Sequence, residues 1–256
     1  MGFIHSVNIR KAVTYYKHYR PQEVTTSLIE KYATTLYQIF SLTHTNVNFD
    51  NFKRKILPRS GTDSLALFYN DKDRIIGFTV VSINLEKIDK LKFIALGTSI
   101  YFDLQYKPTY ILVKYFFYSF IKLKLKYPFT KVVCISSTTS PASYLFHAQR
   151  VYEFYPNYKF TPSLVIKKIT YRVAMSKGCQ LATIDNPWQF KVKPTIPNIG
   201  RFKRIPDNSS PHYEYYKSIN PNFYSGKGIR VYVPLTTFNF LASSFINIKL
   251  LLTKNV

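Results

Sequence analysis

The chain has 256 residues, of which 36 are Lys or Arg and 13 are Asp or Glu, and its formal net charge is +23. This length supports one large domain, or one domain with an extension, and can bury a sizeable core. Hydrophobic residues make up 46% and charged residues 19%, a composition that excludes an intrinsically disordered chain. The 8 glycines and 14 prolines follow no period, which excludes a collagen-like or low-complexity protein.

Hydrophobic periodicity predicts the elements of the N-terminal part. Residues 22–41 carry apolar side chains near the i, i+3, i+4, i+7 spacing, which predicts a helix that faces a core. A short second helix is expected over residues 49–57. Residues 64–69 and 74–85 are rich in β-forming residues and are separated by a short polar turn, so they predict a hairpin.

Strands and helices alternate in the middle of the chain. We expect a strand at 93–104, a buried helix at 110–121, a central strand at 131–137 and a helix at 141–155. Lysines follow the end of the first of these helices, where the helix dipole favours cations.

The last hundred residues give weaker signals. Residues 163–177 are compatible with a helix, and the proline-rich segment 187–211 is expected to be a long loop or arm. A strand is expected at 229–235. The apolar segment 236–252 has the length of an interfacial helix, and it could equally complete the core.

The acidic residues are unevenly distributed. No Asp or Glu lies between Asp103 and Glu153, a stretch that holds several lysines, and none follows Glu214. Regions of one charge sign attract polyanions such as nucleic acid, anionic lipid or a phosphate-rich cofactor. The alternative is that these lysines only solvate the surface.

Cysteine content and missing motifs limit the remaining possibilities. Cys134 and Cys179 are too few for a disulfide scaffold, and the N-terminal residues do not form a secretory signal. We therefore expect a cytoplasmic protein, and a secreted effector remains an alternative. The sequence lacks GxGxxG, GxxxxGK[ST], HExxH and GxSxG, and its five dispersed histidines predict no metal site. A hydrolase built on Cys134 would need His147 beside it, whereas a cysteine in such an apolar strand usually belongs to the core.

The order of the predicted elements resembles the GCN5-related N-acetyltransferases, the acyl-CoA N-acyltransferase fold. In that family two helices precede three antiparallel strands, which are followed by a helix, a strand, a helix and C-terminal strands. The resemblance implies an α/β (α+β) fold with a mixed central sheet, splayed fourth and fifth strands and flanking helices. It divides the chain into a core at residues 1–165 and a C-terminal extension at 166–256, which contains the arm at 187–211 and a strand at 229–235 that completes the sheet.

The resemblance also implies an acyl-CoA donor and no metal. In the family, a loop and helix start after the fourth strand hold the CoA pyrophosphate through backbone amides. The candidate donor-binding residues are Gln105, Tyr106, Lys107, Thr109, Tyr110 and Ser136. The loop departs from the family pattern [QR]xxGx[GA], because bulky residues stand where glycines would let the backbone approach the phosphates. The donor is then held differently, or is not CoA, or activity is lost.

Two residues are candidates for the proton transfers. Ala148 is followed four residues later by Tyr152, as in many family members, where that tyrosine protonates the departing thiolate. Asp103, at the end of the fourth strand, is the candidate base for the amine. The alternatives are that Tyr152 packs in the core and that Asp103 pairs with Lys107.

Two functions follow from these observations. The first is an acyltransferase that moves an acyl group from acetyl-CoA or a longer acyl-CoA to an amine or hydroxyl by direct attack. The second is a catalytically inactive module of the same fold that binds an anionic membrane or, less favoured, nucleic acid.

Overall fold

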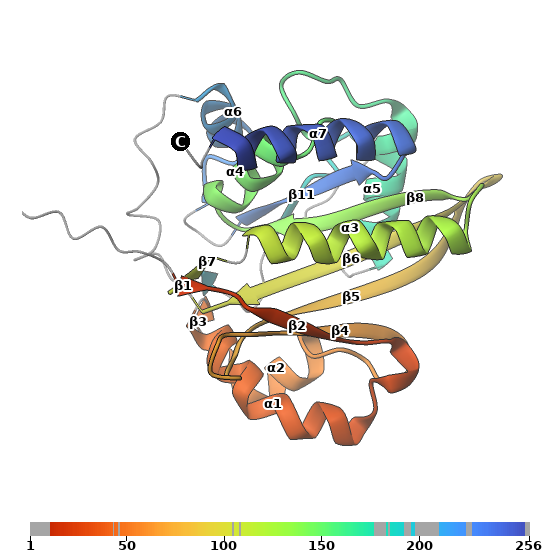
Figure 1. Cartoon of the computed structure of the whole chain (residues 1–256). Helices are drawn as coiled ribbons and strands as arrows, with labels where there is room; N and C mark the ends of the chain where they lie inside the picture. The colour runs from red at the N-terminus through yellow and green to blue at the C-terminus, as the bar shows by residue number, and fades with distance from the viewer. Residues whose placement is uncertain are drawn as a thin grey trace, which may run out of the picture.

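The computed structural model describes residues 11–42, 44–45, 47–103, 105–107, 109–176, 183, 185–191, 196–197, 210–223 and 227–253. Its main element is a seven-stranded sheet in the order β2-β4-β5-β6-β8-β11-β9 (Figure 1). In that order the strands are Tyr15–Tyr19, Asp63–Tyr69, Ile75–Ile88, Leu91–Phe102, Lys131–Thr138, Lys227–Pro234 and Gln189–Lys191. β6 and β8 are parallel, and the other neighbouring pairs are antiparallel. The predicted α/β class with a mixed central sheet is confirmed.

Helices cover both faces of this sheet. Within the described residues they are α1 (Thr26–Ser41), α2 (Phe49–Lys55), α3 (Thr109–Lys126), α4 (Pro141–Arg150), α5 (Leu164–Ser176), α6 (Pro211–Ile219) and α7 (Thr237–Thr253), with a 3-10 turn at Pro21–Glu23. Two short pairings complete the description: β1 (Lys11–Ala12) with β7 (Tyr106–Lys107), and β3 (His44–Thr45) with β10 (Ile196–Pro197). No helix in the described part of the chain combines the length and apolarity needed to cross a membrane.

Alternation along β4 explains how the two faces are filled. Leu65 and Leu67 pack with α1 and α2, whereas Ala66 and Phe68, which point to the opposite face, pack with α3. A third apolar cluster lies where α4, α5 and α6 meet β8 and β11, around fully buried Tyr144, Ile169 and Tyr216. β4 is buried along its whole length, as expected for a strand covered on both faces.

Local capping sets where α1 begins. The pattern predicted a helix from residue 22, but the regular helix begins at Thr26, because Thr25 caps it by accepting a hydrogen bond from the Leu28 amide at 3.2 Å. The preceding residues form the 3-10 turn instead. The helix then ends at residue 41 as predicted.

The prediction that the helix after β8 extends to residue 155 is wrong, because α4 ends at Arg150. The backbone amides of Tyr152 and Glu153 donate to α7 side chains, to Ser243 Oγ at 3.0 Å and Asn239 Oδ1 at 2.8 Å. These contacts replace the carbonyl partners that would continue the helix.

The C-terminal part of the chain joins the same sheet. β11 pairs with β8 from Ile229 opposite Thr138 to Pro234 opposite Val133. β9, which falls in the predicted proline-rich arm, pairs with the start of β11. Residues 192–195 and 198–209 of that arm lie outside the described residues.

Candidate functional site

The two central strands part at one end of the sheet, and we call this place the fork. β6 and β8 pair from Phe93 opposite Lys131 to Thr98 opposite Ser136. β6 then continues to Phe102, where β5 is its one partner strand among the described residues, and β8 continues to Thr138 beside β11. Backbone groups on the facing edges of the two strands are therefore outside the ladder beyond Ser136, where a ligand can take the place of the neighbouring strand.

A polar cluster lies at the last paired position of the fork. The Ser136 hydroxyl is 3.0 Å from Nε2 of His147 on α4, and the Thr98 hydroxyl is 4.0 Å from the Cys134 sulfur. Thr98 and Ser136 are opposite each other in register, so their side chains point to the same face. Ser136 is 8% exposed. A serine bonded to a histidine and a threonine paired with a cysteine thus lie near each other on a sheet face that is otherwise mainly apolar.

Burial lowers the pKa of His147 from 6.5 to about 4. The imidazole is therefore neutral at pH 7 and carries one N–H. With that proton on Nε2, the ring donates to Ser136 Oγ and leaves the serine proton free to donate elsewhere; the other tautomer accepts from Ser136. The pair can present a hydrogen-bond donor or an acceptor at the fork.

The sequence contains features that place His147 on the side of α4 that faces the sheet. Ser140 caps α4 and Pro141 begins it, which fixes the phase of the helix. Tyr144 is fully buried, and His147 follows it by three residues and so shares the face that packs on the sheet. The sequence suggests Cys134 as the neighbour of His147, whereas its hydrogen-bond partner in the structure is Ser136.

The predicted donor loop is anchored to other parts of the molecule. Asp103 is buried, and its Oδ1 accepts a hydrogen bond from the Gln105 amide at 3.1 Å. Tyr106 is 7% exposed, and its hydroxyl accepts from Asn70 Nδ2 at 2.9 Å, which gives the ring a structural role. The Gln105 carbonyl accepts from the Lys11 amide at 2.9 Å, next to the pairing of β1 with β7.

The other predicted donor residues lie around the start of α3. Gln105 is exposed, and Tyr110 is 64% exposed. The side chains of Lys107 and Thr109 lie outside the described residues.

Tyr152 and Asp103 are not brought together. Asp103 follows β6 at the fork, whereas Tyr152 follows α4, which leads about 15 Å away from the fork. The Tyr152 ring makes an edge contact with Phe238 at the start of α7, with the centroids 5.5 Å apart. α7 begins just after Pro234, which lies opposite the beginning of β8. Tyr152 is therefore near the opposite end of the sheet from the fork.

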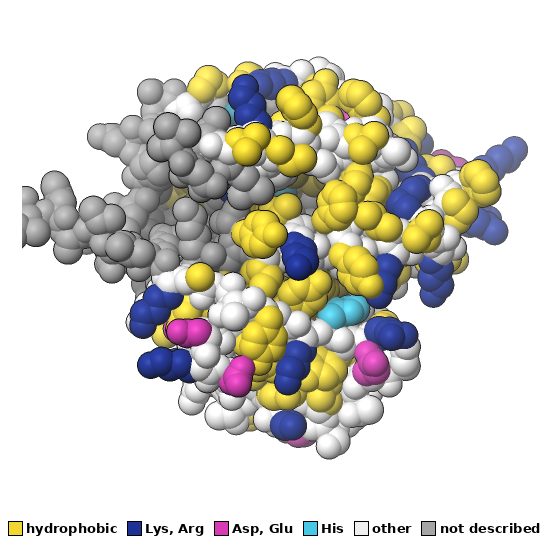
Figure 2. Space-filling model, in the orientation of Figure 1, with side chains coloured by type: hydrophobic (Ala, Val, Ile, Leu, Met, Phe, Trp, Pro, Cys, Tyr) yellow, Lys and Arg dark blue, Asp and Glu magenta, His cyan; other side chains and the backbone are white. Residues whose placement is uncertain are grey.

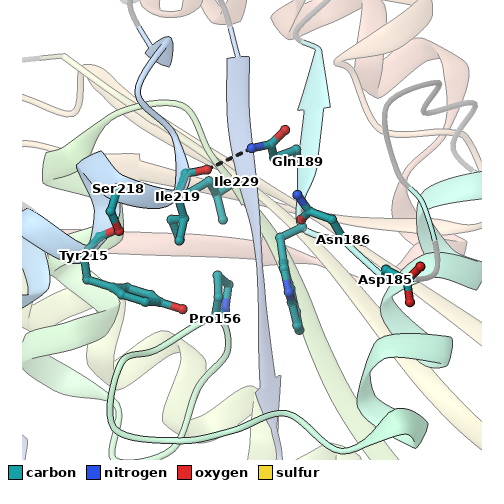
Figure 3. A pocket seen from close by; sticks show the side chains of 9 residues that line it. Pro156, Asp185, Asn186, Gln189, Tyr215, Ser218, Ile219 and Ile229 are labelled. Atoms are coloured by element: carbon teal, nitrogen blue, oxygen red, sulfur yellow. Dashed lines mark hydrogen bonds between the residues drawn. The ribbon is translucent and has the colours of Figure 1, made fainter.

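A separate pocket of about 440 Å³ lies beside β11 (Figure 3). Gln189 is fixed there, because its Nε2 donates to the Ile219 carbonyl at 2.9 Å, as the dashed line marks. Asp185 is the one carboxylate among the described residues that line it, and none of those residues is His or Cys. Its other titratable side chain is Tyr215, and Figure 3 shows Asp185 and Tyr215 on opposite sides of the pocket, so the lining does not bring an acid and a base together.

Metal ligands in the described residues and comparisons with known sequences do not identify a function. Among the described residues, no three His, Cys, Asp or Glu side chains gather as metal ligands. No family model and no curated protein sequence matches the chain. A function therefore has to be argued from the fork and its chemistry.

Proposed function

We propose that this chain is an acyltransferase of the acyl-CoA N-acyltransferase type, with the thioester donor bound in the fork. The observation that carries the proposal is the separation of β6 from β8 after Thr98 and Ser136. After the edge strand β2, the main elements follow the order expected of that family: two helices, three antiparallel strands, a helix, a parallel strand and a helix. The free edges of the fork are suited to an extended amide-containing chain such as the pantetheine arm of CoA.

The chemistry needs little covalent participation by the protein. The amine nitrogen attacks the thioester carbonyl carbon, a C–N bond forms, the C–S bond breaks, and the proton lost by the amine ends on the thiolate. Holding the two reactants in line accounts for much of the rate gain in such a step. We assign Ser136 to donate a hydrogen bond to the departing sulfur, and His147 to position that hydroxyl through its 3.0 Å contact.

This assignment differs from the residues expected from the sequence. Tyr152 takes no part in the proposed step, because it lies near the other end of the sheet from the fork. Asp103 remains the candidate base for the amine. It directly follows the end of β6 at the fork, and no other Asp or Glu occurs in the sequence between it and Glu153. Lys107 and Thr109 remain the candidate phosphate contacts, in place of the glycine-rich loop that this chain lacks.

Isothermal titration of the full chain with acetyl-CoA and with palmitoyl-CoA tests donor binding. We expect at least one of them to bind. If neither thioester binds to the folded chain, the proposal is wrong.

Thiol release tests the assigned residues, with a lysine-containing peptide as the probe acceptor. We expect Ser136→Ala and His147→Gln to lower the rate roughly tenfold to a hundredfold. Tyr152→Phe is the matched control and should leave the rate within about twofold, because it removes a hydroxyl of the same kind far from the fork. A large loss in Tyr152→Phe with no loss in Ser136→Ala would reject the assigned residues, even if a thioester binds.

A further inference from the structure

α7 turns its apolar side outward. Five large apolar side chains are spaced by three or four residues, which aligns them in one stripe along the helix. They are Phe238, Leu241, Phe245, Ile248 and Leu252, with exposed fractions of 65%, 61%, 71%, 55% and 68%. A helix on the surface of a globular protein normally buries such a stripe, so this one is oriented for contact with something outside the described chain.

Polar side chains on the inner side of α7 fix that orientation. Asn239 is 2% exposed, and its Nδ2 donates to the carbonyls of Glu153 and Pro234, both at 2.8 Å. Asn247 accepts from the Arg150 guanidinium at 2.9 Å and donates to the Arg150 carbonyl at 2.9 Å. Rotating α7 to bury its stripe would break these hydrogen bonds and leave the Pro234 carbonyl without a partner in a buried place, which opposes that rotation.

α3 extends the apolar surface. Phe240 of α7 packs on Phe117 and Phe120 of α3, with ring centroids 4.6 and 4.3 Å apart, so the two helices lie side by side (Figure 1). The exposed apolar side chains of α3 are Tyr110, Phe117, Tyr118, Ile121 and Leu125. Figure 2 shows hydrophobic side chains gathered over the area that α3 and α7 occupy in Figure 1. We call this surface the α3–α7 face.

The charge of this face selects the kind of partner. Neither helix contains an acidic residue, and Lys114, Lys122, Lys126 and Lys249 are exposed on them. Lys122 Nζ lies 4.3 Å from the centroid of the Tyr118 ring, so a cation and an aromatic ring share one site. A second copy of this +23 chain would bring like charges together across the contact, which is costly. Anionic lipid offers apolar chains below and negative headgroups above, and it matches both features.

We propose that the α3–α7 face docks on an anionic lipid surface, with both helices lying flat in the headgroup region. The apolar stripe of α7 enters the acyl boundary, and the lysines contact headgroup phosphates and carboxylates. The proposal does not depend on the acyltransferase assignment, because the fork residues Ser136 and His147 do not belong to this face.

Vesicle co-sedimentation of the full chain tests the proposal, with phosphatidylcholine vesicles that contain either no phosphatidylserine or about 30% of it. We expect binding to the anionic vesicles that is strong in low salt and weakens as salt screens the lysines. The Leu241→Ser/Phe245→Ser double variant should reduce the partition coefficient roughly tenfold or more. Lys122→Gln/Lys126→Gln should reduce it by a similar factor on anionic vesicles only.

Matched controls distinguish binding through the α3–α7 face from nonspecific binding through other exposed apolar or charged side chains. Leu85 on β5 and Leu164 on α5 are 73% and 62% exposed, and Leu85→Ser/Leu164→Ser should bind within about twofold of the wild type. Lys31→Gln/Lys87→Gln removes two exposed lysines elsewhere and is the control for charge. Circular dichroism melts confirm that each variant is folded, which is expected because every replaced side chain is exposed.

Three results would overturn the proposal. The first is equal binding to neutral and anionic vesicles, and the second is no loss of binding in the Leu241→Ser/Phe245→Ser variant. The third is a concentration-dependent dimer in sedimentation velocity that this variant abolishes, without vesicle binding by the wild type, which would assign the face to a second copy of the chain.

Discussion

α1 and α7 have nearly the same length, 16 and 17 residues, and both carry apolar side chains at helical spacing, yet they face opposite ways. α1 buries Ala33, Leu36, Ile39 and Phe40, and its exposed positions are all polar. α7 exposes its apolar stripe and turns Asn239, Ser243 and Asn247 toward the protein. An apolar period therefore predicts that a helix forms, while the partners of its polar residues decide which side faces inward.

The largest expected effect comes from removing an aromatic ring on each helix. Phe40→Ala on α1 should lower the free energy of unfolding by about 3–5 kcal/mol, because its ring is fully buried among Phe52 and Tyr101 and would leave a cavity. Phe245→Ala on α7 should change it by less than about 0.5 kcal/mol, because that ring is 71% exposed. Urea unfolding of both variants measures the difference. Similar losses in the two would mean that the α7 stripe is covered in the free protein.

The second test exchanges polar and apolar side chains on α7. Asn239→Leu should cost about 2–3 kcal/mol, because it leaves the Glu153 amide and the carbonyls of Glu153 and Pro234 without their partner in a buried place. Leu241→Asn, two residues away on the exposed side, should be nearly neutral. Thermal or urea denaturation reports both values. A stabilised Asn239→Leu variant would contradict the role of the inner polar side chains.

The same contrast explains how far the sequence could predict the structure. The α/β class, the β4–β5 hairpin, α1 and α5 follow from periods within single segments, and these predictions agree with the structure. The end of α4 does not, because Glu153 bonds to Asn239, 86 residues later in the chain. No local pattern contains that contact.

The candidate site was partly predictable for the same reason. The sequence predicts Ser136 as a donor-binding residue, but it suggests Cys134, and not Ser136, as the neighbour of His147. Which of these two β8 side chains His147 contacts depends on how α4 is positioned and rotated against β8. Tyr152 was chosen from a local motif, and only the path of α4 and the start of α7 place it near the opposite end of the sheet.

The third test concerns the hydrogen-bonded pair of Ser136 and His147 at the fork. Folding lowers the pKa of His147 from 6.5 to about 4, so below pH 6.5 the unfolded chain binds a proton that the folded chain does not. The contribution of neutral His147 to the free energy of unfolding is therefore present above pH 6.5 and is lost as pH falls toward 4. The loss between pH 7 and pH 5 is about 2 kcal/mol.

His147→Gln keeps a hydrogen-bonding partner for Ser136 without a titrating group. Urea unfolding at several pH values should show a shallower loss of stability on acidification in this variant than in the wild type. His18 and His212, whose pKa values burial also lowers, remain in both proteins and cancel in the comparison. Parallel pH profiles for the two proteins would show that His147 is not held neutral by the fold.

The smallest expected effect is that of an ion pair between α1 and α2. Lys53 of α2 and Glu30 of α1 form an ion pair at 2.6 Å, with half of the Glu30 side chain exposed. Glu30→Gln should cost less than about 1 kcal/mol, because water and salt screen such a pair, and the cost should vanish in high salt. In the vesicle assay this variant should bind as well as the wild type. Since it also raises the net positive charge, a marked gain in vesicle binding would mean that total charge, and not the α3–α7 face, determines attraction to the lipid surface.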